Sequence, residues 1–524
     1  MESTREEDRG GTGESDGAAE TRFERARRTT GLLLGPLLMV YLLLQPPPGL
    51  SPQAQHLVAI LALVVTYWVT EPIPIPVTAL LGAILCVIFK VSTAQKVFAP
   101  FADPTIFLFL GSFILARAMM VHNLHRRVAF GILSLRWVGD SSARILFAFG
   151  AIAAFTSMWI SNTATTAMMF PVGLGLAQAV AGLLERKSGK PVDAARLRFG
   201  TGIMLMAAYA ASAGGIGTPV GTPPNLVGMA MIEKLVQTDN NAPVKIPFFQ
   251  WMLFAVPILA ALYVVLFVVL YLLHRPELSR IEGGREYVRG ELDKLGPWTP
   301  GQRNTVAAFV VTVALWVTPG FLSVVFGTGS RIYGEYGARL PEGIAALIGA
   351  VLLFVLPVDW RRREFTLKWH DAVKIDWGTL ILFGAGLSLG SLMFESGFAE
   401  TLGKGLLDAT GIRSLWGMTL GAIVISVLVS ETTSNTAAAN VVVPVVISFS
   451  AAAGIPAVPP ALGATLGASW GLMLPVATPP NAIVYASGMI PITKMIQAGF
   501  LFDLAGIVLI WAGLRVLLPM LGLA

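Results

Sequence analysis

Two stretches of the sequence carry one polar motif: residues 161–172 read SNTATTAMMFPV, and residues 434–445 read SNTAAANVVVPV. The offset from Ser161 to Ser434 is 273 residues, and the offset from Pro171 to Pro444 is the same. A second pair of motifs follows in the same order, since PVGTPPN at 219–225 recurs as PVATPPN at 475–481. Two polar motifs that recur in one order within an apolar chain indicate an internal duplication.

The composition around these motifs is that of a membrane protein. Of 524 residues, 55% are hydrophobic and only 13% are charged, which is roughly half the charged share of a soluble domain. So few charges cannot cover the surfaces of several water-soluble domains. The single cysteine, Cys86, excludes an intrachain disulfide and a cysteine-based metal cluster.

We expect an all-α polytopic fold with about eleven transmembrane helices and two re-entrant hairpins. A span needs ~20 residues, and the stretches 143–180 and 415–450 are too long for one span and carry the SNT motif near their middles. We interpret these two stretches as hairpins that enter and leave on the same side. The spans are expected near residues 31–44, 54–70, 76–90, 104–121, 200–232, 248–273, 304–325, 341–357, 378–402, 459–490 and 498–522.

The distribution of basic residues predicts the orientation. In this arrangement 28 of the 37 Lys and Arg residues fall in segments on the side of the N-terminus, and cytoplasmic loops carry such an excess. We therefore expect a multi-pass protein of the plasma (inner) membrane, embedded in the lipid bilayer, with a cytoplasmic N-terminus and an outside C-terminus. The excess of basic residues thus reflects the orientation of the chain in the membrane. No nucleic-acid partner is expected.

The chain divides into four predicted regions. Residues 1–28 are polar and of mixed charge and are expected to form a disordered cytoplasmic tail. Residues 29–273 form the first repeat with its preceding helix, 274–303 a cytoplasmic linker, and 304–524 the second repeat. Each repeat contains five spans and one hairpin, and an odd number of crossings inverts the second copy. Inverted repeats are typical of secondary transporters, whose sites form at discontinuous helices near the membrane midplane.

The motifs have the chemistry of an ion site. A Ser-Asn-Thr tip presents free N–H groups at a helix N-terminus, where an anion is stabilised, while its hydroxyl, amide and carbonyl oxygens suit Na⁺. Two consecutive prolines break a helix and leave the carbonyls of Gly221 and Ala477 available. Neither motif contains Lys or Arg, so a bound anion would be stabilised by bound cations, and the two sites would be coupled. The alternative is that these polar residues only join helices, which suits one motif better than two.

The doubled motifs, with Glu71-Pro72-Ile73-Pro74, resemble the divalent anion/sodium symporter family, the INDY-type sodium-dependent di- and tricarboxylate transporters, over roughly residues 30–524. The resemblance implies a homodimer whose protomers each have a scaffold domain and a transport domain that moves as an elevator, with Na⁺ co-transported and no organic cofactor. The substrate residues that it implies are Ser161, Asn162, Thr163, Thr222, Ser434, Asn435, Thr436, Thr478 and Pro479. The Na⁺ ligands that it implies are Ser157, Ser161, Asn162 and the Gly221 carbonyl for one ion, and Ser430, Thr433, Asn435 and the Ala477 carbonyl for another.

We expect a carrier and not an enzyme, one that imports C4-dicarboxylates such as succinate, fumarate or malate together with Na⁺. No Walker-type phosphate loop is present in the sequence, and no histidine lies in a polar intramembrane motif. A cation-independent dicarboxylate exchanger on the same fold and an anion channel are the alternatives. The copies differ at residues 165–167 and 438–440, so the half-sites are unequal, and citrate, tartrate and sulfate stay open as substrates. Glu431 could tune cation binding or carry a proton, although a structural role is favoured.

Overall fold

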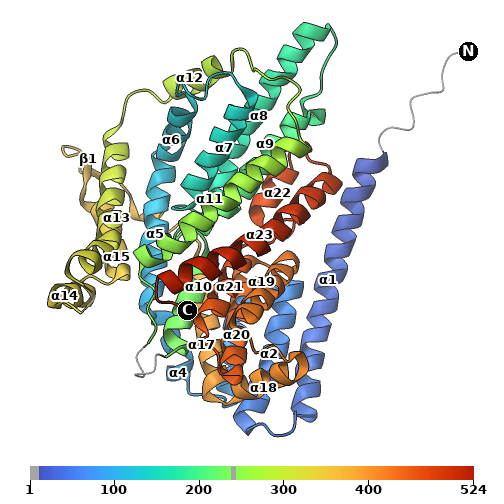
Figure 1. Ribbon diagram of the computed structural model, residues 1–524, viewed down its shortest axis with the longest axis vertical. Helices are drawn as coiled ribbons and strands as arrows, with labels where there is room; N and C mark the ends of the chain where they lie inside the picture. Colours follow the sequence, from blue (N-terminus) through green and yellow to red (C-terminus); the bar gives the residue numbers. More distant parts are fainter. Residues whose placement is uncertain (1–10, 238–242, 328) are drawn as a thin grey trace, which may run out of the picture.

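The computed structural model describes residues 11–237, 243–327 and 329–524, and these residues form a bundle of helices with one small two-stranded sheet (Figure 1). The first half of the chain contains α1 (Gly11–Leu44), α2 (Pro52–Thr70), α3 (Ile75–Ile88), α4 (Ala94–Phe98), η1 (Ala99–Ala102), α5 (Pro104–Val121), α6 (Leu124–Leu133), α7 (Ser142–Ser157), α8 (Asn162–Ser188), η2 (Ala194–Arg196), α9 (Arg198–Gly215), α10 (Pro223–Leu235), α11 (Phe248–Leu273) and α12 (Gly284–Lys294). The second half contains α13 (Pro300–Phe326), α14 (Arg331–Arg339), α15 (Glu342–Val355), β1 (Pro357–Asp359), β2 (Glu364–Phe365), α16 (Trp369–Ala372), α17 (Trp377–Glu395), α18 (Phe398–Thr410), α19 (Leu415–Thr432), α20 (Asn435–Ala453), α21 (Val458–Gly467), α22 (Pro479–Tyr485) and α23 (Ile492–Met520).

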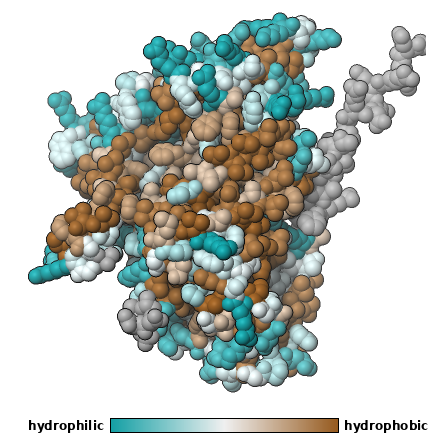
Figure 2. Space-filling view, in the orientation of Figure 1, coloured by the Kyte–Doolittle hydropathy of each residue, from teal (hydrophilic) through white to brown (hydrophobic). Residues whose placement is uncertain are grey.

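The helices are those of a polytopic membrane protein. Among the described residues, ten helices are long and apolar enough to cross a membrane, and α14 with α15, bent by 54°, would add an eleventh as one broken span. Figure 2 shows hydrophobic residues gathered across the middle of the visible face, with hydrophilic residues toward both ends. Helices are the elements that satisfy every backbone hydrogen bond in lipid. The predicted fold class, an all-α membrane protein, is confirmed.

Which helices cross the membrane completely is a separate matter. The ten candidates include α8, α19 and α20, which belong to the stretches predicted as hairpins, whereas α3 and α7, with 14 and 16 residues, fall below the length criterion. The length and composition of two consecutive helices do not show whether each crosses the membrane or whether the pair forms a hairpin that returns to the same side. The re-entrant hairpins and the inversion of the second repeat therefore stay predictions.

Two of the predicted spans are broken helices. The span expected at 200–232 is divided into α9 and α10, and the span expected at 459–490 into α21 and α22. Each second piece begins with its proline pair, and the preceding residue, Thr222 or Thr478, is extended with φ of −147° or −142°. A residue before proline avoids the helical region, whereas proline itself fits the first turn of a helix. The break thus lies before the prolines, which start the next helix.

The first helix extends into the N-terminal region. Helix α1 begins at Gly11, twenty residues before the apolar segment that starts at Gly31, and residues 1–10 lie outside the described part. Disorder of residues 1–28 and the limits of the two repeats stay predictions, because nothing in the helix bounds tests them.

The packing brings the two halves of the chain together around the motifs. Helix α10 of the first half packs on α20 of the second, and α22 of the second half packs on α8 of the first. Helix α5 packs along α15, with Gly111 so close that a Cβ there would lie 2.5 Å from the backbone of Ala346. In Figure 1, α13, α14 and α15 lie at one side of the molecule, and α1 and α2 lie at the other, with the motif-bearing helices between.

Candidate substrate and cation site

One cavity brings both copies of both motifs together. Its volume is about 430 Å³, within the usual range for small-molecule sites. All nine predicted substrate residues line it: Ser161, Asn162, Thr163, Thr222, Ser434, Asn435, Thr436, Thr478 and Pro479. These residues come from four chain segments that lie far apart in the sequence. In the fold, the two copies of both motifs therefore line the same cavity.

Each Ser-Asn-Thr motif starts a helix at this cavity. Ser161 is the N-cap of α8 and Ser434 the N-cap of α20, and their hydroxyl oxygens accept hydrogen bonds from the N–H groups of Ala164 (3.2 Å) and Ala437 (3.3 Å). One cap satisfies one donor, so other first-turn N–H groups lack partners within the helix. Two positive helix ends at one cavity form an environment that stabilises an anion with two separated negative groups.

Oxygen atoms gather behind the first of these tips. The Ser157 hydroxyl donates to Asn162 Oδ1 at 2.7 Å, and both residues are at least nine-tenths buried. A Cβ added to Gly215 would lie 2.4 Å from Asn162 Oδ1, and one added to Gly221 would lie 2.5 Å from the Gly215 carbonyl oxygen and 3.0 Å from that of Ser157. Hydroxyl, amide and carbonyl oxygens thus crowd around Gly221. Hard cations prefer such oxygen ligands.

The second tip repeats the first contact and differs in its surroundings. The Ser430 hydroxyl lies 2.9 Å from Asn435 Oδ1 and 2.7 Å from the Ala468 carbonyl oxygen, so it can donate to either. Thr433, a predicted ligand here, donates instead to the Trp68 carbonyl of α2 at 2.8 Å. Ala477 occupies the position that glycine has in the first copy. The two cation sites are therefore similar but not equivalent.

The predicted cation residues are divided between the wall of the cavity and the layer behind it. Ser161, Asn162, Gly221, Asn435 and Ala477 line the cavity. The other three, which are buried and do not line it, are Ser157, Ser430 and Thr433. Within the described residues, no group of three or more His, Cys, Asp or Glu side chains could hold a metal ion. The predicted ligands at both tips are hydroxyl, amide and carbonyl oxygens, a neutral set that suits Na⁺ better than a transition metal.

Two residues that the sequence-based site omits are Asn225 and Asn481, the last residues of the proline motifs. Asn225 Nδ2 donates to the carbonyls of Gly215 (2.9 Å) and Thr218 (2.8 Å), and Asn481 Nδ2 donates to those of Leu472 (3.1 Å) and Leu474 (3.0 Å). Each amide therefore fixes the non-helical segment at its helix break, where carbonyls have no helical partner. Their recurrence in both motifs was the signal that could have identified them.

Charged residues from outside the motifs also line the cavity. Arg117 of α5 and Lys374 and Asp376, which precede α17, are part of its wall. Arg117 Nε donates to the Asp371 carbonyl at 3.2 Å, and Lys374 Nζ lies 3.0 Å from Asp371 Oδ1. That hydrogen bond from Lys374 lowers the pKa of the Asp371 carboxyl. The motifs lack basic residues, but the cavity does not.

Glu431 belongs to a buried acidic pair beside the second tip. Its Oε1 accepts a hydrogen bond from the Met473 N–H at 2.8 Å, while its Oε2 and both carboxyl oxygens of Asp503 are buried with no hydrogen-bond partner among the described atoms. Both residues are only 4% exposed. Glu431 thus holds the segment before Pro475 through the Met473 N–H, and its structural role stays a prediction.

The difference between the two Ser-Asn-Thr copies lies away from the cavity. Thr165 and Thr166 in the first copy and Asn440 in the second are buried and do not line it. Asn440 Nδ2 donates to the Thr436 carbonyl one turn earlier, at 2.8 Å. These residues therefore pack helices, and the cavity wall itself is similar in the two halves.

Known proteins resemble this chain over nearly its whole length. Residues 27–522 match the model of the sodium:sulfate symporter transmembrane region. The sodium-dependent dicarboxylate transporter SdcS of Staphylococcus saprophyticus is 34% identical over 503 residues, which are 95% of this chain and 93% of that protein. SdcS of Staphylococcus aureus (strain bovine RF122) is 33% identical over 488 residues, 93% of this chain and 90% of that protein.

Solved structures share the fold at low sequence identity. The Alcanivorax borkumensis YdaH transporter aligns with a TM-score of 0.53 and 12% identity, covering 90% of this chain and 99% of that chain. Neisseria gonorrhoeae MtrF aligns with a TM-score of 0.52 and 14% identity, covering 93% and 94%. Both are membrane transporters, and the expectation of a carrier in place of an enzyme is confirmed by the family match. The chain belongs to the sodium:sulfate symporter family, the divalent anion/sodium symporters that its doubled motifs resemble.

Proposed function

We propose that this protein is a secondary active transporter that imports C4-dicarboxylates, such as succinate, fumarate and malate, by symport with Na⁺. The observation that carries the proposal is the single cavity at which the two capped helix N-termini and their two Ser–Asn hydrogen bonds meet. The names of the SdcS relatives, sodium-dependent dicarboxylate transporters, support the choice of cation and of substrate class.

The arrangement explains how a dianion and Na⁺ would depend on each other. One carboxylate would be bound at the N-terminus of α8 and the other at that of α20, with Thr222 and Thr478 supplying hydroxyl donors. Neutral donors leave the negative charge poorly compensated, so a cation at each tip lowers the free energy of the bound anion. Asn162 and Asn435 belong to both sites, because each side chain faces a serine behind the tip and also lines the cavity. Each ligand then raises the affinity for the other.

Two basic residues of the cavity wall support an inward-facing state. Arg117 and Lys374 line it, and the charge distribution assigns the segments 117–127 and 361–374 to the cytoplasm. Basic side chains in the cavity wall would attract dianions at low ionic strength.

The assembly and the movement follow the family pattern. The protein would be a homodimer in the plasma membrane with its N-terminus inside and its C-terminus outside. Each transport domain would move as an elevator past its scaffold domain. Because Cys86 is the only cysteine and is buried, reporter cysteines placed near either terminus can be labelled from one side of intact cells to test the orientation.

Uptake into proteoliposomes tests the proposal directly. Purified protein is reconstituted, and radiolabelled succinate uptake is measured with an inward Na⁺ gradient and with choline in its place. We expect saturable uptake that requires Na⁺. Equal uptake in choline that depends on internal dicarboxylate would indicate the exchanger, and conductance without saturable counterflow would indicate the channel.

A panel of unlabelled competitors identifies the anion. Succinate, fumarate, malate, citrate, tartrate and sulfate are added in excess during Na⁺-driven succinate uptake. We expect the three C4-dicarboxylates to compete most strongly. Stronger competition by sulfate or citrate would overturn the assignment of substrate while leaving Na⁺ coupling intact.

A further inference from the structure

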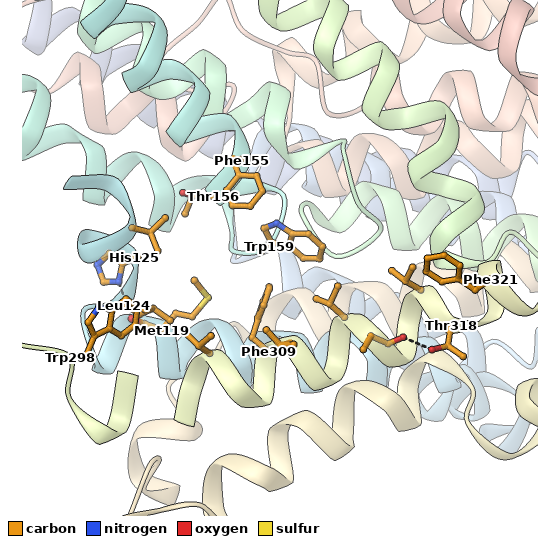
Figure 3. A pocket seen from close by; sticks show the side chains of 16 residues that line it. Met119, Leu124, His125, Phe155, Thr156, Trp159, Trp298, Phe309, Thr318 and Phe321 are labelled. Atoms are coloured by element: carbon orange, nitrogen blue, oxygen red, sulfur yellow. Dashed lines mark hydrogen bonds between the residues drawn. The ribbon is translucent and has the colours of Figure 1, made fainter. Parts of the chain in front are cut away.

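A second, larger cavity lies between α13 and the end of α7, and its lining is almost wholly apolar. Its volume is about 630 Å³. Figure 3 shows Phe155, Thr156 and Trp159 on one side of this space and side chains such as Phe309 on the other. The two walls meet where the Trp159 and Phe309 rings pack edge to face, with centroids 5.2 Å apart. None of the substrate-site residues lines this cavity.

Helix α13 supplies a continuous apolar wall. Val306, Val310, Val313, Val317 and Phe321 all line the cavity, and their spacing of three and four residues places them on one helix face. The distance from the first to the last is ~22 Å at 1.5 Å per residue, which exceeds the ~15 Å of one bilayer leaflet. The cavity is therefore a groove, long enough for an extended hydrocarbon chain.

The groove faces the membrane. Only 17% of the most apolar 18-residue stretch of α13 is buried inside the protein, and Val310 and Phe321 are 58% and 65% exposed. Few polar groups line the groove: the Thr318 hydroxyl already donates to its own helix at Ala314, and Thr156 Oγ1 and Trp159 Nε1 are buried with no hydrogen-bond partner among the described atoms. His125 Nδ1 lies 3.0 Å from the Met119 carbonyl oxygen, so this ring nitrogen already has a hydrogen-bond partner.

One end of the groove has the groups that recognise a phospholipid headgroup. Trp298 lines this end, held by Arg127, whose guanidinium lies 5.2 Å from the indole centre and donates to the Leu295 and Gly296 carbonyls. Tryptophan is enriched at the membrane–water interface. Arg303, three residues before Val306 on the same helix face, is exposed, and its side chain has no ion-pair or hydrogen-bond partner within the described part of the chain. A free cation at the end of an apolar groove is complementary to a lipid phosphate.

We propose that this groove binds one acyl chain of an anionic phospholipid, with the chain along α13 and the headgroup at Arg303. A flexible chain of methylene groups can fill an apolar hollow of this length. The bound lipid would contact Phe155, Thr156 and Trp159, which adjoin Ser157 and Ser161 of the substrate site.

Native mass spectrometry of the purified protein tests the proposal with two matched phospholipids, a phosphatidylglycerol and a phosphatidylcholine with identical chains. We expect the wild type to retain the phosphatidylglycerol preferentially. Ala314→Trp and Val317→Trp fill the groove and should abolish this retention. Val311→Trp is the control, since Val311 is 40% exposed on α13 but does not line the groove. Arg303→Gln should reduce the preference for phosphatidylglycerol about fivefold, the effect of one cation near an anionic headgroup.

Each contrary result overturns part of the proposal. Equal lipid loss in Val311→Trp and the groove variants, with all of them folded by thermal unfolding, would refute the groove as the site. Equal binding of both lipids by the wild type would refute the anionic headgroup. Loss of a two-copy mass in the groove variants, with lipid unchanged, would identify the face as a contact between copies. If Ala314→Trp is unfolded, Val317→Trp decides the matter, and transport activity is not needed for any of these readings.

Discussion

Replacing Gly221 by alanine is the sharpest test of the first cation site. The added Cβ would lie 2.5 Å from the Gly215 carbonyl oxygen and 3.0 Å from the Ser157 carbonyl oxygen. Gly221 is not among the glycines with positive φ, so the cost is a steric one in the oxygen cluster. Since a Cβ is almost never nearer than 3.0 Å to another heavy atom, the Gly215 carbonyl must move by at least ~0.5 Å.

The size of the effect follows from that displacement. Extra methyl groups in a packed site cost about 1–3 kcal/mol, and if that cost falls on the Na⁺-bound geometry, the Na⁺ concentration for half-maximal uptake rises about 5- to 150-fold. Because both ligands share Asn162, whose Oδ1 would lie 2.4 Å from a Cβ on neighbouring Gly215, the succinate affinity at fixed Na⁺ should fall as well.

The assay is succinate uptake in proteoliposomes over a range of Na⁺ concentrations at fixed succinate. Gly182→Ala is the matched control, because a Cβ there meets nothing within 4 Å, and its Na⁺ dependence should equal that of the wild type. The placement of a cation at this glycine would be refuted if the Gly221→Ala protein is folded, is reconstituted normally and keeps the wild-type Na⁺ dependence.

Four further substitutions probe the rest of the site. Asn162→Ala and Asn435→Ala should each lower the affinity for both Na⁺ and succinate roughly tenfold, because one charge-assisted contact is lost. Isothermal titration with each ligand checks this. A defect in succinate binding with normal Na⁺ binding would contradict the shared site. Glu431→Ala removes the acceptor of the Met473 N–H and should lower the unfolding free energy by about 1–3 kcal/mol, measured by thermal unfolding in detergent, whereas an unchanged melting temperature would argue against a structural role. Lys374→Gln at the cavity wall should slow uptake severalfold at low ionic strength and little at high salt, a difference that vanishes if the cation plays no part in attracting the substrate.

Much of the site could be predicted because the motif sets its local structure. A serine before a helix caps that helix, and a proline after an extended residue starts a helix. Ser161, Ser434 and the two proline pairs therefore have these backbone roles whatever the tertiary fold. The doubling of the motifs then indicated that the two copies work together, and the cavity does contain both.

The residues that sequence reasoning missed are those whose partners lie far away along the chain. Arg117 and Lys374 reach the cavity from segments that carry no motif. Thr433 was among the predicted cation ligands, but its hydrogen bond to the Trp68 carbonyl, 365 residues away, is a contact that no local pattern indicates. Asn225 and Asn481 are local, and their recurrence in both motifs could have identified them, but only the structure shows which carbonyls they bind.

The sequence by itself determined that this is a membrane protein and that its helices break at the two Ser-Asn-Thr motifs and the two proline motifs. It also determined that these breaks offer neutral oxygens and free N–H groups. These properties depend on composition and on the conformational limits of proline, glycine and capping serine, all of which act over a few residues. Only the tertiary structure decided that four breaks meet at one cavity, which basic residues stand at its wall, and that a separate apolar groove lies beside α13. Those distances are set by the packing of helices hundreds of residues apart, which short-range preferences do not determine.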